Sequence, residues 1–231
     1  MLKRPDAVIG IISDTHLPYR MEKLPTSIYH IFQGVDCILH AGDVDEIAHL
    51  HPLQALAPLH AVRGNIHLGD FSMGGRDLPA AVQVMVAGKQ IVVTHGHRPG
   101  LMGWLLKVPE ILWATLPGFN IKHLNYSIAQ RLCNAFPQAD IVVFGHTHAA
   151  YAQKIGKILV FNPGSVVPNQ GGMQSVGLIH IWQHKVVTYV VPIHQQLQRQ
   201  ARLTHWLNSP SPAVHSQFSL ASPAFGLKVE G

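Results

Sequence analysis

The sequence predicts an α/β fold with two facing β-sheets and helices on their outer sides. Over residues 7–62, short apolar runs rich in β-branched residues alternate with helix-like segments, which is typical of a parallel sheet. From residue 80 onward, strand patterns follow one another across tight turns, which indicates a second, more antiparallel sheet. At 231 residues, 47% of them apolar, the chain is long enough for one sizeable core.

The first part of the chain alternates strands and helices. The expected elements are a strand over residues 7–12, a helix over 24–32, a strand from residue 37, a helix over 45–56 and a strand from residue 59. Pro25 fits the first turn of its helix, where a missing N–H costs nothing. Asp45 and Glu46 favour a helix start, and the apolar residues after them recur at a spacing of three.

The second part of the chain is dominated by hairpin patterns. The expected strands cover residues 81–86 and 90–94 around a three-residue turn at 87–89, then 140–144, 151–154, 157–161, 175–182 and 186–191. We expect the last two strands to continue the second sheet. Residues 1–193 are therefore assigned to one domain.

Two segments depart from this pattern. Residues 98–137 form an apolar insertion, broken by Pro109 and ending in a helix over 125–136. Trp104 and Trp113 within it predict a lid or helical hairpin packed on the domain, with a homo-oligomer contact or a membrane surface as alternatives. Residues 194–231 are expected to form a helix over 195–207 followed by a mobile tail.

Charge and hydropathy exclude several classes of protein. The formal charge is +5, but the 17 Lys and Arg residues are scattered without a basic run, so no dedicated nucleic-acid surface is expected. No window approaches the ~20 apolar residues of a transmembrane segment, and the first apolar run is too short for a signal peptide core. The two cysteines, Cys37 and Cys133, are expected to be buried reduced thiols. These features predict a cytoplasmic protein.

Five of the predicted strands end in a turn that carries metal-binding side chains, and four of these turns contain glycine. Because the chemistry of open α/β sheets lies beyond the carboxyl ends of the strands, we expect these side chains to converge on one rim. The candidate metal ligands are Asp14, His16, Asp43, Asn65, His95, His146 and His148.

The donor set predicts two divalent transition-metal ions. Mixed carboxylate, amide and imidazole donors suit manganese best, with iron, zinc or nickel also acceptable, and suit calcium or magnesium alone poorly. Seven ligands are too many for one ion, whereas two ions about 3.5–4 Å apart can share a carboxylate. Two divalent ions beside two carboxylates leave a positive site, which favours a small anionic phosphoester as substrate.

The motifs together resemble the calcineurin-like metallophosphoesterase superfamily, in particular its small bacterial and archaeal phosphodiesterase branch. The motifs are Asp14-Thr15-His16, Gly42-Asp43, Gly64-Asn65, Thr94-His95-Gly96-His97 and Gly145-His146-Thr147-His148, followed by the turn Asn162-Pro163-Gly164-Ser165. The resemblance spans residues 7–192 and implies a four-layer αββα sandwich. It implies a hydroxide between two ions as the nucleophile of a phosphodiesterase. It also implies that Asp43 bridges one ion held with Asp14, His16 and His148 and another held with Asn65, His95 and His146.

The general acid departs from the superfamily pattern. Phosphomonoesterase branches carry a His directly after the ligand Asn, whereas this chain has Ile66 there and His67 one residue later. His67 is therefore the candidate catalytic residue that protonates the leaving group. A nucleotide or protein phosphomonoesterase, and a protein-assembly scaffold on the same fold, are the alternative functions.

Overall fold

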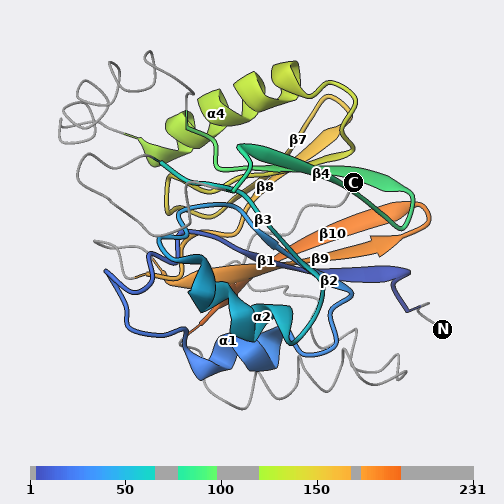
Figure 1. Cartoon of the computed structure of the whole chain (residues 1–231). Helices are drawn as coiled ribbons and strands as arrows, with labels where there is room; N and C mark the ends of the chain where they lie inside the picture. The colour runs from blue at the N-terminus through green and yellow to red at the C-terminus, as the bar shows by residue number, and fades with distance from the viewer. Residues whose placement is uncertain (1–3, 66–77, 98–119, 168–172, 194–231) are drawn as a thin grey trace.

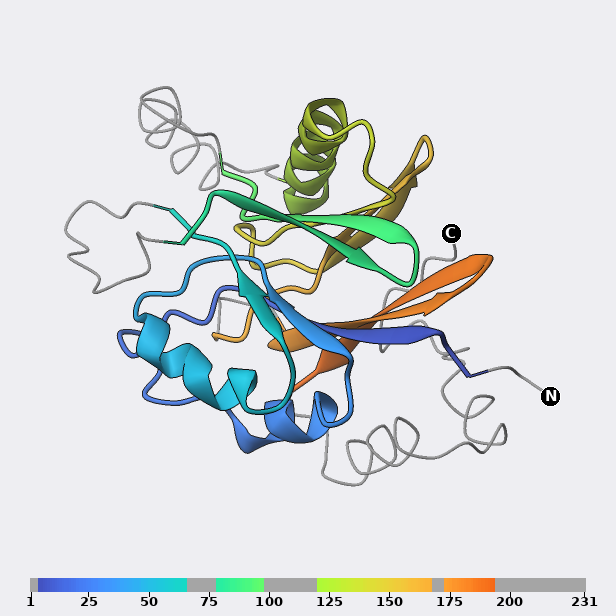
Figure 2. The ribbon, with the colours of Figure 1, turned by 45° about the vertical axis from the view of Figure 1, so that its right-hand side comes forward.

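Two five-stranded β-sheets pack face to face in the computed structural model, which describes residues 4–65, 78–97, 120–167 and 173–193 (Figure 1). Helices lie on the outer side of each sheet, as a view from a second direction also shows (Figure 2). The predicted four-layer αββα sandwich is therefore confirmed. Within these ranges, no helix combines the length and apolar character needed to cross a membrane.

The first sheet has the strand order β10-β9-β1-β2-β3. Its strands are β1 (Ala7–Ile12), β2 (Cys37–His40), β3 (Leu59–Ala61), β9 (Ser175–Trp182) and β10 (Lys185–Pro192). β1, β2 and β3 are parallel, as predicted, whereas β9 pairs antiparallel with β1. The prediction that the last two strands continue the second sheet is therefore wrong. A hairpin pattern identifies its own two strands, but the third strand beside them is set by tertiary packing.

The second sheet has the strand order β4-β5-β6-β8-β7. Its strands are β4 (Ala81–Val86), β5 (Lys89–Thr94), β6 (Ile141–Val143), β7 (Tyr151–Ile155) and β8 (Ile158–Asn162). Val86 pairs with Lys89, so the β4–β5 turn has two residues and not the predicted three. Ala87 and Gly88 have φ of 47° and 74°, the left-handed values that a hairpin turn of this length favours.

Strand β1 shows how one strand serves two layers. Ile9 and Ile11 face the second sheet, whereas Val8 and Ile12 face the helices on the outer side of the first sheet. All four side chains are buried. Burial of such an aliphatic side chain contributes about 1.5–3 kcal/mol, so the strand that precedes Asp14 is firmly held.

Short helices cover the first sheet. They are α1 (Thr26–Ile31), the 3-10 helix η1 (Ile47–Leu50) and α2 (His51–Gln54). The prediction of one helix over residues 45–56 is wrong. Pro52 has no amide proton to continue an α-helical ladder from the preceding turn, and the chain therefore changes from a 3-10 to an α-helical turn near it. Asp45 is buried and does not lie within either helix.

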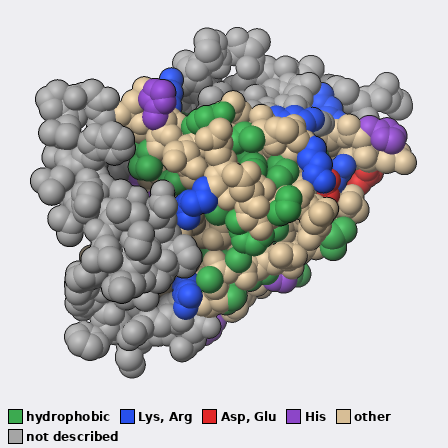
Figure 3. All heavy atoms as spheres, turned by 90° about the horizontal axis from the view of Figure 1, so that it is seen from above, with side chains coloured by type: hydrophobic (Ala, Val, Ile, Leu, Met, Phe, Trp, Pro, Cys, Tyr) green, Lys and Arg blue, Asp and Glu red, His purple; other side chains and the backbone are tan. Residues whose placement is uncertain are grey.

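Helix α4 (Ile121–Ala135) covers the second sheet. It begins before the predicted residue 125 because the side chain of Asn120 caps it, accepting a hydrogen bond from the Lys122 amide at 2.9 Å. Seen from the α4 side, the described surface mixes hydrophobic and polar side chains, with Lys and Arg in small groups (Figure 3). Residues 98–119 of the predicted insertion, including both tryptophans, and the predicted tail over 194–231 lie outside the described residues.

Candidate metal centre

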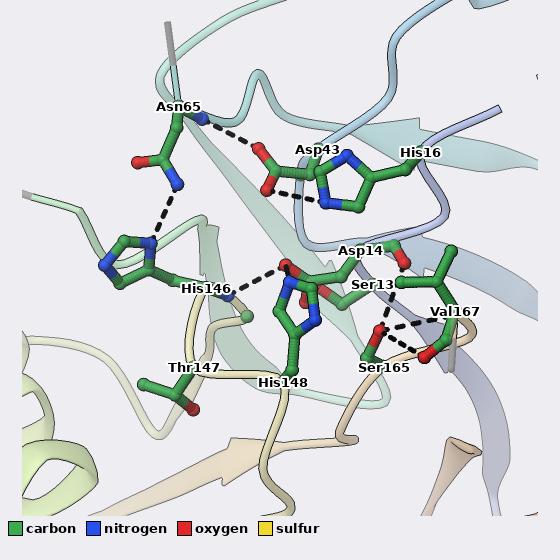
Figure 4. Close-up of polar contacts among 12 residues, drawn as sticks. Ser13, Asp14, His16, Asp43, Asn65, His146, Thr147, His148, Ser165 and Val167 are labelled. Carbon is green, nitrogen blue, oxygen red and sulfur yellow. Dashed lines mark hydrogen bonds and ion pairs between the residues drawn. The ribbon is translucent and has the colours of Figure 1, made fainter. Parts of the chain in front are cut away.

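The seven predicted ligands lie at the ends of strands from both sheets. Asp14 and His16 follow β1, Asp43 follows β2 and Asn65 follows β3, all in the first sheet; His95 follows β5, and His146 and His148 follow β6, in the second sheet. Figure 4 shows Asp14, His16, Asp43 and His148 near one another, with Asn65 and His146 in contact beside them. The predicted convergence of the strand ends is thus present in the structure.

Four of the side chains form a compact donor group. One donor atom from each of Asp14, His16, Asp43 and His148 lies within 4.8 Å of the others. The Nε2 atom of His16 is 3.2 Å from Oδ2 of Asp43, and Nε2 of His148 is 3.3 Å from Oδ1 of Asp14. Two carboxylates and two imidazoles at this spacing fit a single divalent transition-metal ion.

The remaining candidates lie on the other side of Asp43. Oδ1 of the Asp43 carboxylate is 3.3 Å from Nε2 of His95 and accepts a hydrogen bond from the backbone N–H of Asn65 at 2.8 Å. Asn65 directs its side-chain nitrogen to Nδ1 of His146 at 2.9 Å, so ligation through its oxygen would require the amide to rotate. The two oxygens of Asp43 therefore face different histidines, Oδ2 facing His16 and Oδ1 facing His95.

The backbone is strained at most of the predicted ligands. Five of them have φ in the left-handed region: Asp14 at 53°, His16 at 46°, Asp43 at 56°, His146 at 73° and His148 at 54°. Each such residue costs of order 1–3 kcal/mol when the side chain is not glycine, and strain of this kind clusters at functional sites. Elsewhere in the described chain, Ala87 in the hairpin turn is the one other non-glycine residue with positive φ.

Glycines let the ligand loops approach one another closely. A Cβ atom on Gly64 would overlap Oδ1 of Asp43, and one on Gly145 would overlap Oγ of Ser13. A Cβ on Gly42 would lie 2.6 Å from Nδ1 of His95. These contacts explain why glycine precedes Asp43, Asn65 and His146 in the sequence.

Hydrogen bonds orient the donor atoms. Nδ1 of His95 lies 2.8 Å from the Ala41 carbonyl, which places a proton on Nδ1, so that Nε2 is the atom that the neutral imidazole would offer to a metal ion. This Nε2 atom is buried and faces Oδ1 of Asp43 at 3.3 Å. Ser13 donates to Oδ2 of Asp14 at 2.6 Å. The residues present therefore fit a metal centre.

The sequence did not predict a supporting role for His40, Thr15 or Asp45. Nδ1 of the fully buried His40 accepts from the Gly42 amide at 3.2 Å, so its Nε2 proton points to Oγ1 of Thr15 at 3.1 Å. Thr15 in turn donates to the Asp43 carbonyl at 3.3 Å. Asp45 lies 3.6 Å from Nδ1 of His16, the second nitrogen of a candidate ligand. The position of His40 within an apolar strand pattern could have indicated that this histidine is buried and supports the site.

The electrostatics favour cations. Burial alone would raise the pKa of Asp43, but the charge of His95 and contacts with His16 hold it well below the usual value. Burial would lower the pKa of His16 and His95, but Asp43 outweighs it and raises both to about 9. In the metal-free protein, protons on these imidazoles thus provide the positive charge that metal ions would supply.

Other histidines are held neutral. Burial lowers the pKa of His40 to about 4 and that of His146 to about 3. A neutral imidazole is the form that binds a metal ion, so His146 is ready to act as a ligand at neutral pH. The predicted general acid, His67, and its neighbour Ile66 lie outside the described residues.

Comparisons with known proteins agree with this geometry. A sequence model of the calcineurin-like phosphoesterase superfamily domain matches residues 8–184. The probable metallophosphoesterase MJ0623 of Methanocaldococcus jannaschii is 29% identical over 188 residues, covering 81% of this chain and 82% of that protein. The phosphodiesterase YfcE of Escherichia coli is 33% identical over 98 residues, 42% of this chain and 38% of that protein. The structure of Vps29 from Entamoeba histolytica, complexed with zinc, superimposes with a TM-score of 0.59 at 19% identity, covering 81% of this chain and 93% of that one.

Proposed function

The chain belongs to the calcineurin-like phosphoesterase superfamily, and from this premise we propose that it is a phosphodiesterase that depends on two divalent metal ions. The observation that carries the proposal is the position of Asp43, whose two carboxylate oxygens face two different groups of donor side chains. Manganese is the proposed metal, with iron, zinc or nickel as alternatives, because the donor set mixes carboxylate and amide oxygens with imidazole nitrogens.

The residues divide between two proposed ions. Asp14, His16, Asp43 and His148 would hold one ion, and Asp43, Asn65, His95 and His146 would hold the other. When bound, such a pair of ions activates water for attack at phosphorus and offsets the charge that develops on the phosphoryl oxygens. Asp43 and Asp14 keep low pKa values, so both remain charged and available to divalent cations at neutral pH.

Charge balance supports an anionic substrate. The two carboxylates carry two negative charges, which two divalent cations would exceed by two, because the four imidazole donors are neutral when they bind metal. A phosphodiester carries one negative charge and fits such a site. A small phosphodiester is proposed over a phosphomonoester because Ile66 takes the place of the His of the monoesterase branches, and because the E. coli relative is named a phosphodiesterase.

His67 remains the proposed general acid. A departing alkoxide must be protonated, and a positioned acid is worth about 10²–10⁴ in rate for a poor leaving group. The dependence of rate on leaving-group pKa tests this role. His67→Ala is expected to lose little with nitrophenyl esters and much with alkyl or ribose leaving groups. Parallel dependences in the two proteins would assign the proton to water or to another group.

The proposed activity is tested with metal-reconstituted protein. We expect hydrolysis of a bis-aryl phosphate with manganese, iron or zinc, a lower rate on an aryl monophosphate, and loss of both after chelation. Asp43→Ala should abolish turnover, whereas His184→Ala, at an exposed position in the β9–β10 turn, should not change it. Binding of no more than one ion per chain would contradict the dinuclear centre. A higher rate on the monophosphate would favour a phosphomonoesterase.

A protein-assembly scaffold is the competing function on this fold. All seven candidate ligand positions hold residues of ligand type, and five of them adopt strained backbone conformations that a scaffold does not require. These features support an enzyme. Tight metal binding without turnover on any phosphoester, cyclic and linear dinucleotides included, would favour the scaffold.

A further inference from the structure

Helix α4 contacts the loop that carries two of the candidate ligands. Asn125 on this helix is only 1% exposed, although its side chain is polar. Its Oδ1 atom accepts a hydrogen bond from Oγ1 of Thr147 at 2.7 Å, and its Nδ2 atom donates to the Ala149 carbonyl at 3.2 Å. Thr147 lies between His146 and His148 in the sequence, so one side chain of α4 fixes the turn that joins them.

The same helix also contacts the loop after His95. The guanidinium of Arg131 donates to the carbonyl oxygens of Gly96 and His97, the latter at 3.4 Å. Between these polar contacts, Ile128 packs over Gly96, where an added Cβ would lie 3.3 Å from it. Residues 125, 128 and 131 recur at a spacing of three and therefore share one face of the helix. This face spans both ligand loops of the second sheet.

A second asparagine completes the contacts from the opposite side. Asn162, at the end of β8, donates to Oγ1 of Thr147 at 3.1 Å and to the Gly145 carbonyl at 2.9 Å. The Thr147 hydroxyl can thus accept a hydrogen bond from Asn162 while it donates one to Asn125, so both bonds can form at the same time. His146 and His148 flank this hydroxyl with φ of 73° and 54°, conformations that persist only when the surroundings impose them.

We propose that α4 is a positioning element of the metal centre, in which Asn125 and Arg131 hold the loops of His95, His146 and His148 in the conformation that binds metal. The inference rests on the proposed function and extends it to residues that are not ligands themselves. Outer residues that orient metal ligands are typically worth 10- to 100-fold in metal affinity or activity. A purely structural role would instead lower the stability of the fold without a specific effect on metal binding.

The test separates these two roles by calorimetric titration of manganese chloride into chelator-stripped full-length protein. Asn125→Ala and Arg131→Ala should each weaken manganese binding by about tenfold or more. The matched control is Leu132→Ala on the same helix, which removes a buried apolar contact with the sheet but no bond to a ligand loop. It should lower the melting temperature at least as much, while manganese affinity stays within twofold of the wild type. Arg131→Lys should recover only part of the affinity, because an ammonium lacks the planar fork that serves two carbonyls.

Two results would overturn the proposal. One is manganese affinity within twofold of the wild type in both Asn125→Ala and Arg131→Ala. The other is an equal loss of affinity in Leu132→Ala. If Asn125→Ala does not fold, Arg131→Ala and Arg131→Lys decide the question by the same titration. Failure of the proposed function gives a different result, since the wild-type protein would then bind manganese without hydrolysing phosphodiesters.

Discussion

His40 should make the stability of the metal-free protein depend on pH in mild acid. Its imidazole is fully buried on β2, and burial lowers its pKa from the usual 6.5 to about 4. Between these two values the unfolded chain binds a proton that the folded protein excludes. Protonation therefore favours unfolding, and the stability that the neutral imidazole provides is complete above pH 6.5 and is lost as the pH falls toward 4.

The size of the effect follows from the two pKa values. The pKa of His40 is 6.5 in the unfolded chain and about 4 in the folded protein. This difference lowers the free energy of unfolding at pH 5 by about 2 kcal/mol relative to pH 7.5. The assay is urea unfolding of chelator-treated protein at pH 7.5 and pH 5, for the wild type and for His40→Gln. The variant should be less stable at pH 7.5, because contacts with Thr15 and Gly42 change, but should lose about 2 kcal/mol less on acidification.

The exposed residue His184 supplies the control for this measurement. His184→Gln should lose as much stability as the wild type between the two pH values, because the substitution leaves His40 and its buried surroundings unchanged. Equal losses in His40→Gln and the wild type would refute the reasoning. They would mean that His40 accepts a proton in the folded protein.

Three further predictions concern the metal centre. Asp43→Ala should weaken the affinity for each of the two proposed ions by about 100-fold, since each ion loses one donor. Elemental analysis of the purified variant should find less than one ion per chain. Gly64→Ala should destabilise the protein by about 1–3 kcal/mol in urea unfolding and weaken manganese binding, because its Cβ would overlap the Asp43 carboxylate; Gly88→Ala, in an open turn, should leave binding unchanged. Chelation should lower the melting temperature measured by calorimetry, because a ligand at 100 times its Kd stabilises the folded state by about 2.7 kcal/mol. An unchanged melting temperature after complete metal removal would contradict the last prediction.

Local patterns were sufficient to predict most of the site. Each ligand follows a short apolar run typical of a strand, and the rule that strand ends meet at one rim places residues far apart in sequence together. The number of ligands indicated two ions that share a carboxylate, and the family resemblance implied that this carboxylate is Asp43, whose side chain lies between two donor groups. The structure adds the orientation of the Asn65 amide, which no sequence pattern specifies.

The errors arose where long-range contacts decide the structure. The position of β9 beside β1 depends on pairing between segments about 170 residues apart, which the hairpin pattern of β9 and β10 does not encode. Asp45 was interpreted as a helix start, but in the structure it faces His16. Asn125 was predicted only as the first residue of a helix, because its burial and its bonds depend on a loop that follows the helix.

Each proposed ion takes donors from both sheets, and this division constrains how the protein can be assembled or divided. Asp14, His16 and Asp43 meet His148 across the sandwich, and Asp43 and Asn65 meet His95 and His146 in the same way. Neither sheet alone carries a complete donor group. A chain cut between residues 65 and 78 would separate four donors from three, so metal binding would report reassociation of the two fragments. Metal binding at this centre therefore depends on the correct placement of the two sheets relative to each other.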